Sequence, residues 1–487
     1  MKLFPLFMKI GGPAVLLIVT CFVILSFFPG HMSGDSFHMF SQALRGEYTD
    51  WHSPILAFTW RLLMISFKSF GPAPVLFLQV FFAAVSLMYF LWVICWDRFR
   101  LLLVPVGASL LLIYPPILGW LGVVSKDIAF GVPLILASAI LVKRWRSPES
   151  GSSSILSEIL LWSCFIWSIA VRYNGLPAVI FLIWFRFYQY FDGPAKIEGE
   201  KNRKGEVFEK IKILSFCSSG TSKPIIGHFW AGFMSMLIGL FLLVGARFYI
   251  KTIMNPIEEF PSQQVMLFDL AGLSTEIGRS LLPEESFPGA DIATLSSLYW
   301  PESVNPLFWG EGKRVVLNRS PDVVRMIKRR WAYAILDYPI KYLTVRWRMF
   351  RGFLGASTLG KAVCAPFHDR IDENNLGITV VFENFNKVLI SYLNYWKDSL
   401  LNRLWLYLSV LFISTAFLLF TEAEAGIWLV PCSGLVYTLS YFFFAPACDL
   451  RYGWYSVAIA MLSIPLCFSA FLAKSQSLNG EKIARSV

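Results

Sequence analysis

Long apolar runs constrain this chain more than any other feature of its sequence. A transmembrane helix needs about 20 mainly apolar residues, and runs of this kind recur from one end of the chain to the other. We count ten candidate spans, at 10–28, 73–96, 101–120, 127–142, 155–171, 174–191, 225–250, 403–420, 426–446 and 454–473. The sequence therefore predicts an all-α polytopic membrane protein with about ten transmembrane helices.

Composition agrees with this prediction and argues against several classes of protein. Charged residues make up 15% of the chain, against roughly 25% in a soluble domain. Lys and Arg outnumber Asp and Glu by 43 to 32, but they fall in the short gaps between apolar runs, where basic residues orient a membrane protein. We therefore predict no nucleic-acid partner. The 8 cysteines show no CxxC spacing, so a zinc or iron–sulfur centre is not expected.

The basic residues also predict the topology. With the N-terminus inside, the inner connections hold clusters such as Arg98 with Arg100 and Lys143 with Arg144, as the positive-inside rule requires. Both termini are then cytoplasmic. The chain divides into a membrane module at 1–250 with a first outer loop at 29–54, a large extracytoplasmic loop at 251–402, and C-terminal spans with a short cytoplasmic tail at 403–487.

Two further segments are predicted to lie at the membrane surface. Residues 54–70 are apolar enough to span, but Arg61 and Lys68 favour an interfacial or re-entrant helix, and counting a span here would invert every later loop. Residues 340–355 alternate apolar and basic side chains, with Arg346 on the basic face. That pattern fits either a helix on an anionic lipid surface or a packing helix with a solvated basic face.

Polar residues gather in four clusters that bracket the spans. The clusters are 31–52, 125–127, 172–174 and 449–452, and the predicted topology puts all four on the outer face. Ionisable groups at membrane depth are costly and tend to be functional. Because the four clusters share one side, we expect them to converge on one pocket at the membrane edge, beneath the large loop.

Six residues in these clusters are candidates for chemistry, and each also has a structural interpretation. Asp35 follows the first span in a Ser/Gly-rich turn, where a carboxylate can cap the next helix or act as a base or metal ligand. His52 is titratable, or a hydrogen-bonded helix cap. Lys126 and Asp127 form either an interfacial ion pair or a cation for an anionic head beside an acid. Arg172 and Arg451 either snorkel or bind phosphate through the guanidinium fork, which we favour.

At this point the sequence resembles the GT-C superfamily, polytopic glycosyltransferases that take a sugar from a polyprenyl-phosphate carrier on the outer face of the membrane. Asp35 matches their acidic residue in the first outer loop, and His52-Ser53-Pro54 matches a His-Pro-like element with one inserted Ser. The chain is more closely similar to a bacterial branch of that superfamily. The matching motifs are Pro29-Gly30, Gly34-Asp35-Ser36, Ser125-Lys126-Asp127, Arg172-Tyr173-Asn174-Gly175 and 268–274.

The resemblance implies a fold and a set of roles. It implies a GT-C-like helical fold in a bacterial inner membrane, a polyprenyl-phosphate sugar as donor, a lipid, glycan or protein as acceptor, and membrane lipids as surroundings. Asp35 would be the base or a metal-assisted activator of the acceptor. Arg172 and Arg451, with Lys126, would hold the lipid phosphate, and Asp127, His52 and Asp269 would contact sugar or acceptor. Mg²⁺ or Mn²⁺ would find oxygen ligands in Asp35 with Asp127 or Asp269, although no spacing fixes such a site.

Other interpretations stay open at this stage. A transporter or flippase of lipid-linked sugars, or an O-antigen ligase or polymerase, would also have many spans and a basic outer pocket, and a scaffold that binds another protein through the large loop is the least favoured. Cys364 and Cys448 are the two thiols predicted outside. An oxidising compartment permits a bridge between them, but two unpaired thiols fit the sequence equally well.

Overall fold

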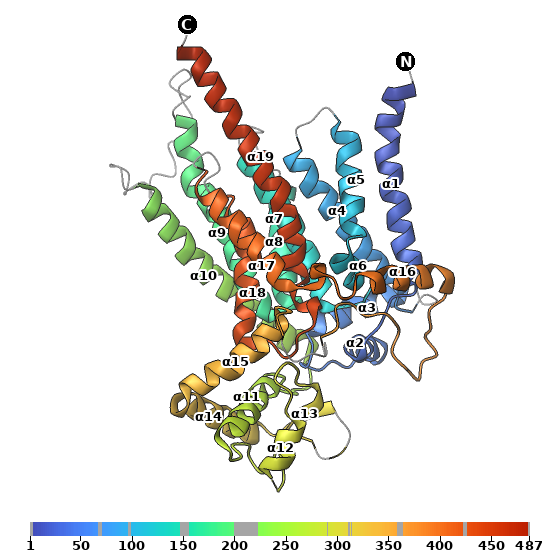
Figure 1. The fold of residues 1–487 in the computed structure, drawn as a ribbon, viewed down its shortest axis with the longest axis vertical. Coiled ribbons are helices and arrows are strands. Elements are labelled where there is room, and N and C mark those ends of the chain that lie inside the picture. Colours follow the sequence, from blue (N-terminus) through green and yellow to red (C-terminus); the bar gives the residue numbers. More distant parts are fainter. Residues whose placement is uncertain are drawn as a thin grey trace.

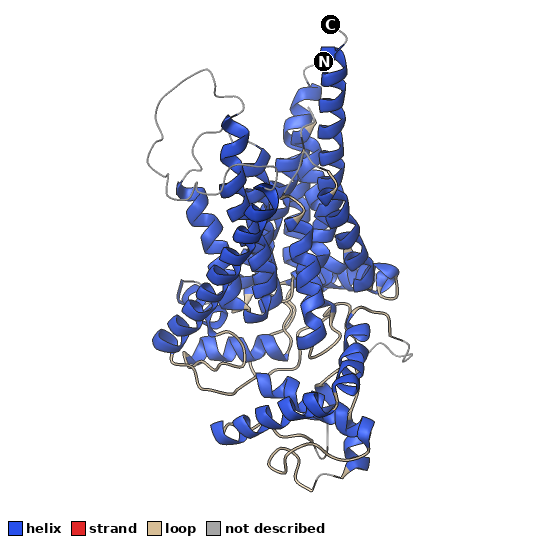
Figure 2. Ribbon diagram, turned by 90° about the vertical axis from the view of Figure 1, so that its left-hand side faces the viewer, coloured by secondary structure: helices blue, strands red, loops and turns tan. Residues whose placement is uncertain are grey.

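The fold is described from a computed structural model, and helices account for all of its regular structure. The structure describes residues 3–66, 71–95, 99–146, 155–198, 223–289, 291–309, 312, 314–357, 364–421 and 426–485. Within these ranges there are helices and isolated β-bridges, with no strand (Figure 2). The all-α prediction is confirmed.

The long helices stand side by side as a bundle (Figure 1). They are α1 (Leu3–Phe27), α4 (Ala73–Ile94), α5 (Arg100–Leu112), α6 (Pro115–Leu121), α7 (Lys126–Arg146), α8 (Ile155–Val171), α9 (Leu176–Glu198), α10 (Lys223–Tyr249), α17 (Leu404–Leu419), α18 (Leu429–Phe444) and α19 (Trp454–Arg485). Both termini lie at one end of the bundle, which we call the terminal end, and the large loop lies at the other, the loop end (Figure 1).

Shorter helices occupy the loop end. They are α2 (Gly34–Arg45), α3 (Pro54–Ser66), α11 (Ser262–Ile277), α12 (Ile292–Leu298), α13 (Asn305–Trp309), α14 (Pro321–Asp337), α15 (Pro339–Phe353) and α16 (Glu383–Trp396), with single turns η2 (Tyr173–Gly175), η4 (Ile250–Met254), η5 (Leu400–Asn402) and η7 (Leu450–Gly453). Helices α11–α14 form a body of their own below the bundle, which we call the loop subdomain. Helix α15 connects it to α18, and α16 returns to pack on α1 (Figure 1).

Membrane-spanning character is clear for part of the bundle. Among the described residues, five helices are long and apolar enough to cross a membrane, or six if the bent pair α5 and α6 forms one span. All ten predicted runs contain helices, but the number of ten spans is not confirmed, because α9 is not among these candidates and α8, α17 and α18 have only 17, 16 and 16 residues. At 1.5 Å per residue these reach about 24–26 Å, less than a bilayer core of about 30 Å.

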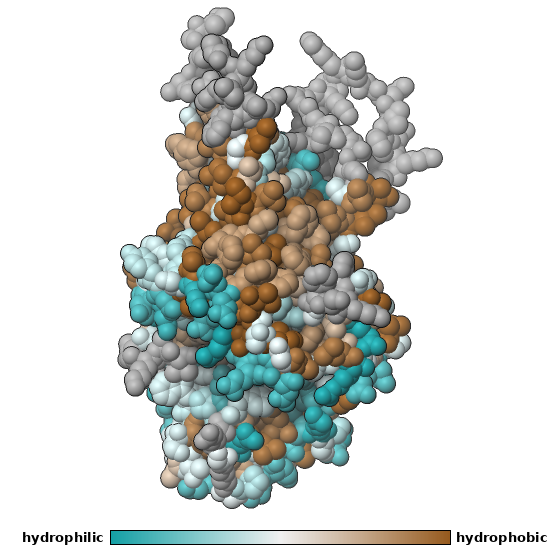
Figure 3. All heavy atoms as spheres, turned by 90° about the vertical axis from the view of Figure 1, so that its right-hand side faces the viewer, coloured by the Kyte–Doolittle hydropathy of each residue, from teal (hydrophilic) through white to brown (hydrophobic). Residues whose placement is uncertain are grey.

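The surface shows where lipid would lie. An apolar belt covers the middle of the molecule on the face in Figure 3, and hydrophilic residues gather toward the loop end. Large apolar side chains such as Leu17, Phe81 and Leu110 are more than half exposed on α1, α4 and α5. Since water would not support so much exposed apolar surface on this scale, the chain is a membrane protein.

Helices α5 and α6 meet at a bend of 69° that the sequence explains. Pro115 and Pro116 begin α6, and the residue before a proline avoids the helical region, so Tyr114 is extended (φ −64°, ψ 123°). Helix α6 ends at Gly122, where an added Cβ would lie 1.9 Å from the Phe27 ring. Only glycine lets this turn pack against α1 and place the residues before α7 at the loop end.

The structure has a helix at each of the two segments considered for the membrane surface, α3 and α15. The described part of the segment at 54–70 is α3, whose 13 residues extend about 20 Å, less than a bilayer core and in agreement with an interfacial or re-entrant helix. Residues 67–70 lie outside the described residues. Helix α15 buries its apolar side and contacts α11 and α18, as a packing helix does. The placement of Arg346 on a solvated face is wrong, because its side chain is 0% exposed. A carboxylate inside the fold, Asp269, draws it inward.

Candidate functional site

Residues far apart in the sequence form one charge cluster at the loop end. Its members are Asp35, His52, Lys126, Asp127, Arg172, Asp449 and Arg451. Arg451 lies within ion-pair distance of Asp35, Asp127 and Asp449. His52 joins Asp35 to Lys126, and Arg172 pairs with Asp127. All four polar clusters predicted to converge contribute to it. The structure thus brings together every predicted site residue except Asp269.

Asp35 lies in the first turn of α2 with its side chain 36% exposed. It does not cap the helix, since the turn is fixed by Ser33 N donating to Ser36 Oγ (3.1 Å) and Ser36 Oγ donating to Val124 O (2.7 Å). Its Oδ2 instead accepts from Arg451 Nη1 at 2.8 Å. Burial opposes ionisation, but Arg451, His52 and Lys126 outweigh it and hold the pKa of Asp35 well below its ordinary value of 3.8.

His52 connects Asp35 to Lys126. Lys126 Nζ donates to His52 Nδ1 at 2.7 Å, and His52 Nε2 lies 3.6 Å from Asp35 Oδ1. Burial, followed by the charge of Lys126, lowers the pKa of His52 to about 4, so the ring is neutral at neutral pH. With Nδ1 accepting, the ring proton is assigned to Nε2, facing the carboxylate. Among the described residues Lys126 has no carboxylate within ion-pair distance.

Asp127 and Arg172 form the buried floor of the cluster. Their side chains are 1% and 4% exposed and make a direct ion pair. Asp127 also accepts from Ser125 Oγ (3.0 Å), and Arg172 donates to Tyr441 OH through Nε (3.1 Å) and Nη2 (2.5 Å). Arg172 is therefore committed to protein partners, which makes it a residue that positions the cluster.

The turn that follows Arg172 contains a glycine whose role is steric. A Cβ at Gly175 would lie 2.1 Å from the Phe130 ring on α7. The absence of a side chain lets η2 approach α7 closely. Within the Arg-Tyr-Asn-Gly motif, Arg172 thus supplies the charged partner of Asp127, and Gly175 permits the close packing that this pair needs.

Arg451 stands at the centre of the cluster with its side chain 13% exposed. Its Nε lies 3.3 Å from Asp449 Oδ2 and 4.0 Å from Asp127 Oδ2, and Nη2 donates to Tyr452 OH at 3.1 Å. Burial raises the pKa of Asp449 although Arg451 opposes the shift. Three cations and three carboxylates meet here, so the resting cluster is close to electroneutral and an entering anion must compete for its cations.

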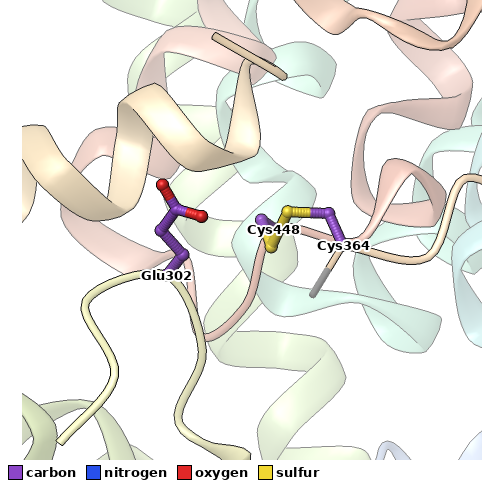
Figure 4. A group of neighbouring side chains, drawn as sticks. All are labelled: Glu302, Cys364 and Cys448. Atoms are coloured by element: carbon purple, nitrogen blue, oxygen red, sulfur yellow. A yellow bond between two sulfur atoms is a disulfide. The ribbon is translucent and has the colours of Figure 1, made fainter. Parts of the chain in front are cut away.

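A disulfide holds the turn that carries Arg451. Cys364 in the large loop is bonded to Cys448 (Figure 4), which resolves the choice that the sequence left open. Leu450 N donates to Ala365 O (3.3 Å), and Val304 N donates to Pro446 O (3.0 Å). The turn at 446–451 is therefore held by two separate segments of the large loop.

Asp269 lies in α11 and takes no part in the cluster. Its side chain and that of Arg346 are both 0% exposed, and Oδ2 accepts from Arg346 Nη2 (2.6 Å) and Trp331 Nε1 (2.8 Å). Burial raises its pKa although Arg346 opposes the shift. This geometry ties α11 to α14 and α15 and gives Asp269 a structural role.

The described residues do not assemble the expected metal ligands. Asp269 is elsewhere, and Asp127 is neutralised by Arg172. In the part of the chain that the structure describes, three residues with metal-ligand atoms come within reach of one another only at Glu302, Cys364 and Cys448 (Figure 4), and there the two sulfurs are consumed by the disulfide.

Two residues of the site were not among the candidates from the sequence. Tyr441 accepts from Arg172, but it sits in a predicted membrane span with no charged residue near it in the sequence to mark it. Asp449 belongs to a predicted cluster and stands two positions before Arg451, so its proximity to that arginine was a usable signal.

The fold and the cluster together define a polytopic helical membrane protein with a polar site at one end of its bundle. Comparison with family models, with curated proteins and with solved structures returns no match for this chain.

Proposed function

We propose that this protein is an integral-membrane glycosyltransferase that moves a sugar from a polyprenyl-phosphate donor to a lipid, glycan or protein acceptor. The observation that supports this proposal best is the charge cluster itself. It combines a partly exposed, ionised Asp35 with a central Arg451 and with Lys126, which has no carboxylate partner among the described residues, at an end of an apolar bundle. A lipid-linked phosphate needs such cations near the membrane edge, and a transfer reaction needs a proton acceptor beside them.

The chemistry of an inverting transfer assigns a role to each exposed member. An acceptor hydroxyl attacks the anomeric carbon, the bond from that carbon to the phosphate oxygen breaks, and the electron pair leaves with polyprenyl phosphate. Lys126 and Arg451 would stabilise the charge that grows on the phosphate. Asp35 would take the hydroxyl proton, and the neutral His52 would hold its other oxygen. Asp127 and Arg172 would position Lys126 and Arg451 from below.

Arg451 gives this scheme an order of events. While Arg451 pairs with Asp35, the pKa of the carboxyl is too low for an efficient base, because the best catalytic pKa lies near the working pH. A phosphate that binds Arg451 would weaken this ion pair and raise the pKa of Asp35. Donor binding would then prepare the base.

The test is a transfer assay on purified protein. We would incubate it with radiolabelled polyprenyl-phosphate sugars and membrane extract, and measure the label transferred by wild type, Asp35→Asn and Glu258→Gln. Glu258 is an exposed carboxylate paired with Lys251 outside the cluster, so its variant is the matched control. We expect transfer by wild type and control and loss in Asp35→Asn. Full activity of a properly inserted Asp35→Asn protein would remove the proposed base.

One observation favours a second candidate, a transporter or flippase of lipid-linked sugars. The pair α5 and α6 is bent by 69° next to the site, and interrupted helices often form transport sites. A transporter built on repeats would show a second interrupted helix in its other half, and the described residues contain one bent pair of this kind. Donor lipid that crosses a vesicle membrane without transfer of label would favour this candidate.

A further inference from the structure

A second charged site lies at the terminal end of the bundle. A cavity of about 210 Å³ opens among the ends of α4, α5 and α7, and its lining consists of Tyr89, Trp92, Val93, Cys95, Arg100, Lys143 and Arg146. We call it the basic pocket. It shares no residue with the charge cluster, and the proposed function does not use it.

The described lining of the basic pocket carries charges of one sign. Arg100, Lys143 and Arg146 are cationic, and none of the described lining residues is a carboxylate. The neighbouring Arg144 lies outside this lining and donates to Glu158 Oε1 at 2.7 Å. An anion that enters the cavity would be attracted by all three lining cations.

Arg100 is oriented for such an anion. Its Cζ lies 3.6 Å from the centre of the Trp92 ring, so the guanidinium stacks on the indole. The stacking fixes the plane of the guanidinium and leaves the fork at its edge, which suits two phosphate oxygens. Arg100 Nε is buried and has no hydrogen-bond partner among the described residues. An anion in the cavity would supply the acceptor that this buried donor lacks.

The remaining cations give the pocket a fixed side and a mobile side. Arg146 Nη1 donates to Ser469 Oγ (2.8 Å), which in turn donates to Ile94 O at the end of α4 (2.9 Å). This chain of bonds joins α7, α19 and α4 around the cavity. Lys143 is exposed, with Nζ 5.8 Å from the Tyr89 ring centre, and it can move toward a ligand.

We propose that the basic pocket binds the phosphate group of an anionic membrane lipid. The surface beside it suits acyl chains, because Leu101 and Leu103 follow Arg100 with 41% and 49% of their surface exposed, and Phe81 on α4 is 55% exposed. Basic pockets between membrane helices bind such headgroups, and Trp and Tyr favour the same interface. Free phosphate has the same chemistry without the chains, so the experiment must separate the two.

Native mass spectrometry of the full-length protein in detergent can measure this binding. The delipidated protein is titrated with phosphatidylglycerol, with phosphatidylcholine and with inorganic phosphate. Lys143→Gln removes one pocket charge from an exposed side chain without touching the packing, and Arg100→Gln removes the stacked guanidinium. The matched control is Arg144→Gln, which removes an equal charge from the same turn of α7 but leaves the pocket lining intact.

The expected result is tighter binding of phosphatidylglycerol than of phosphatidylcholine, weakened about fivefold by each pocket variant and little changed in the control. Binding of inorganic phosphate that is weakened in the Lys143 and Arg100 variants would support a phosphate site in the basic pocket, and it would show that phosphate binds there without acyl chains. Equal retention of the two lipids together with no phosphate binding would overturn the proposal. Equal losses in Arg144→Gln and Lys143→Gln would also overturn it, since they would show a general effect of charge.

Discussion

Asp35 and Asp269 are both aspartates paired with an arginine, and the structure uses them in opposite ways. Asp269 and Arg346 are 0% exposed, and Trp331 of α14 donates a second hydrogen bond to the Asp269 carboxylate. Asp35 is 36% exposed, and its partner Arg451 is shared with Asp449 and Tyr452. A pair that is fully enclosed stabilises a fold, whereas a pair with exposed and shared partners can exchange them for a ligand. The solvent exposure of the aspartate and the number of groups that share its arginine therefore distinguish a functional pair from a structural one.

The first way to sharpen this comparison is to break the enclosed pair. Arg346→Leu leaves Asp269 as a buried carboxylate without its cation, so we expect the free energy of unfolding to fall by about 3–5 kcal/mol. Asp35→Asn should cost less than about 1 kcal/mol, because its pair is partly exposed. Thermal unfolding in detergent measures both. Equal shifts in the two unfolding temperatures would contradict the division into structural and functional pairs.

The disulfide between the large loop and the turn that carries Arg451 should give the next largest effect. Cys448→Ser opens a bridge across 84 residues and should lower stability by about 2–4 kcal/mol. It should also reduce activity, because the turn at 446–451 carries Arg451. In the wild type, thiol labelling should detect Cys364 and Cys448 only after reduction. A labelling mass shift that reduction leaves unchanged would rule out the bridge.

Acid should destabilise the site region through its buried histidines. Burial lowers the pKa of His52 to about 4, and burial likewise lowers that of His31 to about 4, against an ordinary value of 6.5. The neutral rings therefore make their full contribution to stability above pH 6.5. As pH falls from 6.5 to 4, each histidine lowers the free energy of unfolding by up to about 3 kcal/mol. The free energy of unfolding, measured across this range, should change less steeply with pH in His52→Gln than in wild type. Identical slopes would mean that His52 is not buried as a neutral group.

The smallest expected effect concerns the floor of the cluster. Tyr441→Phe removes the hydroxyl that accepts two hydrogen bonds from Arg172, and a bond to a charged group contributes about 1.5–3 kcal/mol. The matched control is Tyr455→Phe, which removes another buried hydroxyl, one that shares a hydrogen bond with Ser433 Oγ (2.7 Å). We expect the first variant to unfold at the lower temperature. A lower unfolding temperature for the control than for Tyr441→Phe would mean that groups other than the Tyr441 hydroxyl hold Arg172 in place.

The sequence predicts much of this architecture because its strongest signals are local. Apolar runs define the helices, and the shared sidedness of four polar clusters predicts that Asp35, His52, Lys126 and Arg451 meet. Span number is less predictable, because a run of 16 or 17 residues is a helix whether or not it crosses a bilayer.

Pairing within the site depends on tertiary packing and could not be predicted in the same way. Nothing local indicates that Arg172 turns inward to Asp127, or that Asp269 finds Arg346 across the loop subdomain. Tyr441 is hidden in an apolar run, because its hydroxyl acquires a partner only when α18 packs beside Arg172. Sequence therefore locates the charges, and the fold decides which of them remain accessible to a ligand.

The most direct test of the central claim compares transfer rates per folded molecule for wild type, Asp35→Asn and Glu258→Gln with one polyprenyl-phosphate sugar. The account predicts a rate lower by about 10²–10⁴ for Asp35→Asn, an unfolding temperature near that of wild type, and no loss in the control. A folded Asp35→Asn protein that transfers sugar at the wild-type rate would contradict it and leave the charge cluster without a catalytic role.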